Sequence, residues 1–129
     1  MNSREKGKRG ERRWRDMLRD AGFLKAHRGV QYQGTSGSPD VQCPELPGIH
    51  FEVKHVERLN IWEAMAQAAR DSGAAKTPVV AHTRNRSGWL VTMRAEDWLD
   101  LLRRSDFVAP SEISDLKSQI AAPPQEDAA

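Results

Sequence analysis

The apolar residues of the chain recur at two spacings, which predict helices and strands. A stripe with offsets of three, four and seven residues predicts a helix from about 3 to 21. A second stripe predicts a helix over 60–72, which Asn60 and Glu63 open as a capping box. A third helix is expected over 95–104. The residues of this last helix that we expect to face inward are Trp98, Leu101 and Leu102.

Strands are predicted between the helices. Short strands are expected over 25–30 and 40–43, and a hairpin over 77–83 and 89–92. The clearest strand is 49–54, in which apolar and polar residues alternate, so that one face packs against helices and the other presents charge. The polar face consists of His50, Glu52 and Lys54. This order of elements predicts an α/β fold with a central mixed five-stranded sheet flanked by helices.

Length and composition limit the class of protein. The 129 residues suffice for one domain, which we place at 1–107, followed by an acidic, Pro- and Ala-rich tail at 108–129 that we expect to be largely disordered. No apolar run approaches the ~18 residues of a membrane span, and no secretory leader is visible, so membrane and export functions are excluded. The single cysteine, Cys43, cannot form an internal disulfide, which predicts a cytoplasmic setting.

The charge of the chain is unevenly distributed. The net charge is only +2, but the first 30 residues hold 10 basic and 4 acidic side chains. A basic segment of this kind can bind phosphates, although a merely solvated helix face has the same composition. The cations that would line a nucleic-acid backbone are Arg4, Lys6, Lys8, Arg9, Arg12, Arg13 and Arg28, with Arg84 and Arg86 as an extension.

The residues that carry chemistry are two carboxylates and a lysine. Glu52 and Lys54 share one face of a strand, and a hairpin that begins at Asp40 would bring its carboxylate beside that of Glu52. Two adjacent carboxylates repel each other unless a proton or a cation lies between them, and oxygen ligands favour Mg²⁺, with Mn²⁺ as a substitute. The carbonyl of Val53 would complete this ligand set, and Lys54 would position an attacking water. Glu11, on or beside the apolar stripe of the first helix, would join the metal shell or hold Lys54, and the whole set predicts a phosphodiester hydrolase.

These residues resemble the motif of the PD-(D/E)XK nuclease superfamily, in particular its archaeal-type Holliday junction resolvases and their phage relatives. The matching segments are Gly7-Lys8-Arg9-Gly10-Glu11-Arg12, Ser38-Pro39-Asp40 and Phe51-Glu52-Val53-Lys54. The resemblance covers about residues 4–104 and implies a restriction-endonuclease-like core. The catalytic residues that it implies are Glu11, Asp40, Glu52 and Lys54, and its metal ligands are Asp40, Glu52, Val53 and Glu11.

The resemblance also implies a substrate and a way to hold it. We expect a Mg²⁺-dependent endonuclease that cuts branched DNA such as Holliday junctions, in the cytoplasm of a bacterial, archaeal or phage-infected cell. A homodimer would suit a junction, because two related strands require two active sites. Gln67 aligns with a glutamine of the relatives, but Asp71 stands where they often carry an aromatic residue. The residues expected to contact DNA are Lys8, Arg9, Arg12, Arg28, Thr35, Ser36, Ser38 and Gln67.

Other interpretations of the same residues remain open. The enzyme could instead be a phage or repair nuclease that acts on linear, flapped or nonspecific DNA, or the fold could serve a non-catalytic DNA-binding protein. Asp40 could be an ordinary turn residue, and Glu52 and Lys54 a surface ion pair. His50 and His55 flank the motif and are either surface groups or further contacts to substrate or metal.

Overall fold

The computed structural model describes residues 3–29 and 40–110, and the chain forms two compact units, residues 1–93 and 94–129. Among the described residues, the first unit holds two helices and a sheet, and the second holds one helix. The elements of the first unit are α1 (Ser3–Asp20), β1 (His27–Arg28), β2 (Val41–Gln42), β3 (Ile49–His55), α2 (Ile61–Ser72), β4 (Thr77–Thr83) and β5 (Leu90–Met93). No helix within the described ranges is long and apolar enough to cross a membrane.

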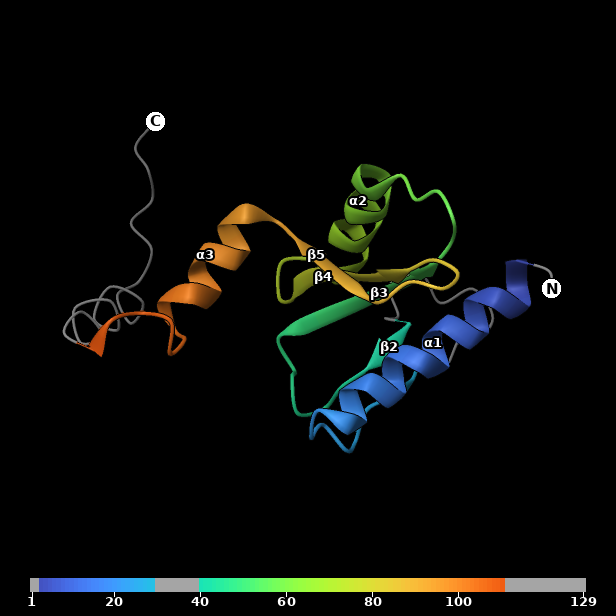
Figure 1. The fold of residues 1–129 in the computed structure, drawn as a ribbon. Coiled ribbons are helices and arrows are strands. Elements are labelled where there is room, and N and C mark those ends of the chain that lie inside the picture. Colours follow the sequence, from blue (N-terminus) through green and yellow to red (C-terminus); the bar gives the residue numbers. More distant parts are fainter. Residues whose placement is uncertain (1–2, 30–39, 111–129) are drawn as a thin grey trace. The chain divides into compact units, whose positions relative to one another are not determined.

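The sheet has five strands in the order β1-β2-β3-β4-β5. Strands β3 and β4 run parallel and the other neighbours run antiparallel, so the sheet is mixed. The crossover between the parallel strands contains α2, as a parallel connection requires. Helix α1 lies on one face of the sheet and α2 on the other (Figure 1). The predicted α/β class with a central mixed five-stranded sheet is confirmed.

The apolar face of β3 forms the main core with α1. Phe51 and Val53 point toward α1 and are buried with Trp14 and Leu18, whose helical spacing places them on one face of that helix. The rings of Trp14 and Phe51 meet edge to face with centroids 5.6 Å apart. The other members of this core are Ala26, Val41, Cys43, Val79 and Ala81. The prediction that the apolar side of this strand packs against a helix is therefore confirmed.

The polar face of β3 packs against α2 through small residues. Ala64 and Ala68 of α2 are buried against Val80 of β4, and their size lets the helix approach the sheet closely. Asn60 caps α2, because its side-chain oxygen accepts a hydrogen bond from the backbone N–H of Glu63 at 3.2 Å. The close approach of α2 encloses the charged residues of the strand, which become the candidate site.

The second unit contains the predicted last helix. Helix α3 (Ala95–Arg103) forms where it was predicted, but none of its residues is buried. Trp98 and Leu101 are about half exposed, and the described residues of this unit alone do not enclose them. The expected inward packing of Trp98, Leu101 and Leu102 stays a prediction. The apolar residues of this unit that the structure describes are too few to enclose a core. Most of the predicted tail, residues 111–129, lies outside the described residues.

Candidate active site

Asp40 is held at the start of β2 by backbone pairing with β3. Its N–H donates to the carbonyl of Phe51 at 3.1 Å, and its side-chain Oδ2 accepts a hydrogen bond from the N–H of Val53 at 2.9 Å. This register turns the carboxyl group of Asp40 toward that of Glu52, with which it forms a side-chain hydrogen bond. The predicted neighbourhood of the two carboxyl groups is therefore present in the structure.

Burial and mutual repulsion disfavour the ionisation of both carboxyl groups at once in the absence of a cation. Burial, together with the negative charge of Glu52, raises the pKa of Asp40 to about 7 from an ordinary value of 3.8. Burial also acts to raise the pKa of Glu52, but hydrogen bonds from His50 and Asp40 and the positive charge of Lys54 outweigh it, and the pKa of Glu52 is lowered. Below about pH 7, Asp40 therefore carries the proton and Glu52 the charge. A divalent cation would replace that proton.

Lys54 is oriented by the helix on the same side of the sheet. Its Nζ donates a hydrogen bond to Oε1 of Gln67 in α2 at 3.0 Å. Both side chains line an open cleft of about 570 Å³. Arg58 and Arg70 line the same cleft, so three cationic side chains and one carboxylate, that of Glu63, face it. The positive charge of Lys54 also acts on the buried carboxylate of Glu52. A phosphate that enters this cleft would meet a wall with net positive charge.

A second group of ligand atoms surrounds Glu52 on the α2 side. His50, Glu52 and Asp71 each offer one atom, and these three atoms lie within 4.8 Å of one another, close enough to hold a metal ion. His50 is only 1% exposed and Glu52 only 2%, and Nε2 of His50 donates to Oε1 of Glu52 over 3.5 Å. Glu52 could therefore bind a metal ion together with either of two groups: Asp40 on one side, or His50 and Asp71 on the other. The sequence pattern had singled out Asp71 only as a departure from the relatives.

Glu11 pairs with an arginine in this structure. Its Oε1 accepts hydrogen bonds from Nε and Nη2 of Arg28 in β1, at 3.2 and 3.1 Å. Its negative charge also contributes to the raised pKa of Asp40, although less than burial and Glu52 do. Glu11 therefore acts electrostatically on the carboxyl pair, while the hydrogen bond of Lys54 goes to Gln67.

The residues expected to contact DNA have different surroundings. Arg9 and Arg12 are exposed on α1, whereas Lys8 lies 4.0 Å from Glu5 and Arg28 is engaged with Glu11. Thr35, Ser36 and Ser38 lie outside the described residues.

Sequence reasoning missed three residues of the site, Arg58, Arg70 and Asp71. A signal for two of them was present, because Arg70 and Asp71 follow Gln67 by three and four positions and so share its helix face. Arg58 lies in the segment between β3 and α2, where no periodic pattern could place it.

The donor set fits a hard divalent cation. Two carboxyl groups lie together in a largely buried setting, and leaving both ionised there without a cation would be costly. Oxygen ligands of this kind suit Mg²⁺ or Mn²⁺, and the histidine nearby would also suit Mn²⁺. A lysine held beside such a pair, in a cleft with two arginines, provides the charge needed to handle a phosphodiester.

Comparison with known proteins agrees with this geometry. The sequence profile of the family described as "Phage putative PDDEXK endonuclease" matches residues 2–121. The letters of that description correspond to Pro39-Asp40 and to Glu52-Val53-Lys54 in this chain. Neither a curated protein nor a solved structure gives a significant match.

Proposed function

The chain belongs to this phage PDDEXK endonuclease family, and on that premise we propose that it is a divalent-metal-dependent DNA endonuclease with Asp40, Glu52 and Lys54 as its catalytic residues. The observation that carries the proposal is the adjacent pair of carboxyl groups, the buried one of Glu52 and that of Asp40 with its raised pKa, beside an oriented lysine. The alternative is that Glu52 and Lys54 form only a surface ion pair and that Asp40 is an ordinary turn residue. That alternative explains neither the burial of Glu52 nor the hydrogen bond from the Val53 amide to the carboxyl group of Asp40.

Asp40, Glu52 and the carbonyl of Val53 would hold Mg²⁺, with Mn²⁺ as a substitute. When bound, the cation supplies polarisation of the scissile phosphate and a lowered pKa for a water molecule. Asp40 contributes by giving up its proton, which the cation makes favourable. The hydrogen bond from the Val53 amide fixes the carboxyl group of Asp40 before any ligand arrives, so little reorganisation is needed.

Lys54 and Glu11 have separate roles in this proposal. Lys54, held by Gln67, orients the attacking water and stabilises negative charge on the phosphate oxygens. Glu11, held by Arg28, acts on the site from α1, where its negative charge would favour positive charge at the carboxyl pair, whether a proton or a divalent cation.

We propose branched DNA, including four-way junctions, as the substrate and a homodimer as the active form. The support for this is the resemblance of the motif to junction resolvases and the symmetry argument that two strands need two sites. A nuclease for linear or flapped DNA is the alternative, since the same residues serve both reactions.

Cleavage by the purified chain tests the proposal. Equimolar linear, flapped and four-way-junction DNAs are incubated with Mg²⁺, with Mn²⁺ and with EDTA, and the products are resolved by electrophoresis. The test variants are Asp40→Asn, Glu52→Gln and Lys54→Ala. Asp20→Asn serves as the control, because it removes a carboxylate from the exposed end of α1.

We expect metal-dependent cleavage that falls at least 100-fold in the three test variants and stays unchanged in the control. Preference for the junction by tenfold or more would support a resolvase. Equal cutting of all substrates would favour the nonspecific alternative. Cleavage that survives in Asp40→Asn and Glu52→Gln would contradict the proposed site, and no cleavage of any substrate by the wild type would favour a non-catalytic DNA-binding protein.

A further inference from the structure

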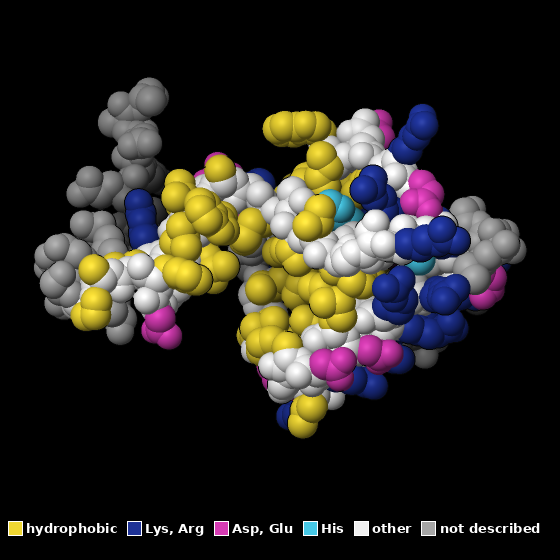
Figure 2. Space-filling model, in the orientation of Figure 1, with side chains coloured by type: hydrophobic (Ala, Val, Ile, Leu, Met, Phe, Trp, Pro, Cys, Tyr) yellow, Lys and Arg dark blue, Asp and Glu magenta, His cyan; other side chains and the backbone are white. Residues whose placement is uncertain are grey.

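A second cleft lies on the α1 side of β3, and its walls are basic. It has a volume of about 480 Å³ and lies between α1 and the turn that joins β4 to β5. Four of its lining side chains are lysines or arginines and none is a carboxylate. Lys and Arg side chains gather on the surface at this turn and the neighbouring part of α1 (Figure 2). The lining residues are Lys6, Arg9, Arg13, His55, Asn85 and Arg86.

The positive charge of this basic cleft is only partly compensated. Lys6 forms an ion pair with Glu57 at 3.8 Å. The guanidinium of Arg13 lies 5.8 Å from the centre of the Trp89 ring, and this contact orients the positive charge of Arg13 without neutralising it. In the described part of the chain, Arg9 and Arg86 have no ion-pair partner. The basic cleft therefore keeps a field that attracts an anion, and its open shape suits an extended one.

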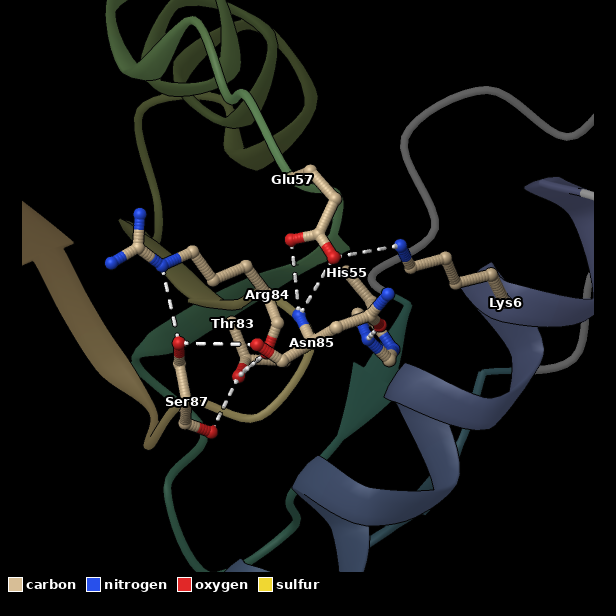
Figure 3. A network of polar contacts seen from close by, with 7 residues as sticks. All are labelled: Lys6, His55, Glu57, Thr83, Arg84, Asn85 and Ser87. Carbon is tan, nitrogen blue, oxygen red and sulfur yellow. Dashed lines mark hydrogen bonds and ion pairs between the residues drawn. The ribbon is translucent and has the colours of Figure 1, made fainter.

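The turn that carries Arg86 is fixed by a network of hydrogen bonds. The backbone N–H of Asn85 donates to both carboxylate oxygens of Glu57 at 3.2 Å, and Nε2 of His55 donates to Oδ1 of Asn85 at 3.1 Å. Thr83 donates to carbonyl groups inside the same turn. Figure 3 shows these contacts together with the pair of Glu57 and Lys6, so one network joins α1, the end of β3 and the turn.

Arg86 has an unusual backbone conformation. Its φ is +58°, and it is the only residue other than glycine with a positive φ in the described ranges. Glycine or asparagine would adopt this conformation with less strain, so an arginine here is disfavoured by the backbone alone. The network that fixes the turn maintains this strain and presents the guanidinium at the basic cleft, which is typical of a binding position.

We propose that the basic cleft binds backbone phosphates of the DNA substrate, at a position separate from the carboxyl pair. The proposal rests on the proposed function, because it assigns the second contact of the same substrate. Lys54 and His55 are neighbours on β3 whose side chains point to opposite faces, so the candidate active site and the basic cleft flank the same end of that strand. A duplex that lies across this end reaches both, and the arginines can bind phosphate oxygens through two hydrogen bonds each.

DNA binding without cleavage tests the proposal. Binding of a fluorescently labelled 30-base-pair duplex to the full chain is measured by anisotropy in EDTA, between about 50 and 200 mM NaCl. The variants are Arg9→Gln, Arg86→Gly and the double variant. Lys76→Gln is the matched control, because it removes one exposed positive charge at the opposite end of β4. Thermal unfolding of each variant checks the fold, and Arg86→Gly is expected to be at least as stable as the wild type because glycine relieves the positive φ.

Each single arginine variant is expected to weaken DNA binding about three- to tenfold near 100 mM salt. The logarithm of the association constant falls as the logarithm of the salt concentration rises, and each variant is expected to make this slope shallower by about one. The double variant is expected to reduce the slope by about two, and Lys76→Gln to stay within twofold of the wild type. Wild-type affinity in both arginine variants would overturn the proposal, and so would an equal loss in Lys76→Gln, since net charge alone would then explain the effect.

The failure of this proposal is distinguishable from the failure of the nuclease proposal. If the variants weaken binding and the wild type cleaves no DNA in Mg²⁺ or Mn²⁺, the basic cleft stands and the proposed catalysis is wrong. If the wild type cleaves and the variants bind normally, catalysis stands and the basic cleft is not a phosphate site.

Discussion

Asp40 and Glu52 illustrate how residues of a proposed active site reduce stability. Their carboxyl groups are brought together in a largely buried place, where ionising both of them without a cation costs free energy. A carboxyl whose pKa is raised on folding binds a proton more tightly in the native state than in the unfolded state. The metal-free protein therefore loses stability from this group as pH rises from about 4 through about 7.

We predict that Asp40→Asn stabilises the metal-free protein at pH 8 and has little effect at pH 4. The amide can still accept the hydrogen bond from Val53 and cannot ionise, so the expected gain in free energy of unfolding is about 1–3 kcal/mol at pH 8. Chemical denaturation of both proteins in EDTA across this pH range measures the difference. The prediction fails if the variant is less stable than the wild type at pH 8, or if the difference does not change with pH.

Gln67 is predicted to orient Lys54. Gln67→Met keeps the size of the side chain and removes the oxygen that accepts from Lys54, so we expect kcat to fall about tenfold while DNA affinity in EDTA stays the same. Gln67→Glu keeps an acceptor and is the control, with a smaller loss of kcat. A loss of affinity with unchanged kcat would instead mean that Gln67 contacts DNA, as the resemblance to resolvases suggested.

At the scale of elements, the approach of α1 to β3 depends on one glycine. A Cβ atom at Gly10 would lie 2.8 Å from Cβ of His55, closer than such atoms come in proteins, and the contacting atom is too near the backbone to move aside. A Cβ atom at Gly7, in the same helix, would meet no neighbouring group of the described residues within 4 Å. Gly10 therefore tests the close packing of α1 on β3, and Gly7 is its matched control.

We predict that Gly10→Ala lowers the free energy of unfolding by about 1–2 kcal/mol, because overpacking outweighs the better helix propensity of alanine. Gly7→Ala should raise it by about 0.5–1 kcal/mol through propensity alone. Urea denaturation of both variants beside the wild type measures these changes. Equal effects of the two substitutions would show that α1 does not pack this closely on β3.

The elements that sequence predicts best are those whose pattern is local. The strand at 77–83 and the helix capped by Asn60 were predicted with their observed bounds, because alternation and capping depend on neighbouring residues. The short strands β1 and β2 are each only two residues long, well short of the predicted 25–30 and 40–43. Pairing defines them rather than propensity, since β1 pairs with β2 and β2 with β3.

The candidate site was also predictable only in part, because its local pattern is visible in the sequence and its long-range contacts are not. The order of Asp40, Glu52 and Lys54 indicated one shared site, and strand alternation placed two of them on one face. The partners of these residues were not predictable, because the bond of Lys54 to Gln67 and the pair of Glu11 and Arg28 depend on how distant elements pack. The buried surroundings of His50 likewise come from α2, which lies elsewhere in the sequence.

At the scale of the whole molecule, the proposed substrate requires two active sites. If the enzyme resolves junctions, the chain is expected to be a dimer whose two sites cut strands of like polarity. Light scattering after size exclusion, at the protein concentrations used for cleavage, should then give twice the mass of one chain. A monomer at those concentrations that still cuts both strands of a junction would contradict the dimer, without affecting the assignment of the catalytic residues.

The central claim is that Asp40 and Glu52 hold a divalent cation, and anomalous diffraction from crystals soaked in Mn²⁺ tests it most directly. We predict one strong anomalous peak between the carboxylates of Asp40 and Glu52, which disappears in Asp40→Asn crystals. A peak held instead by His50, Glu52 and Asp71, or no peak near Glu52 at saturating Mn²⁺, would contradict the account.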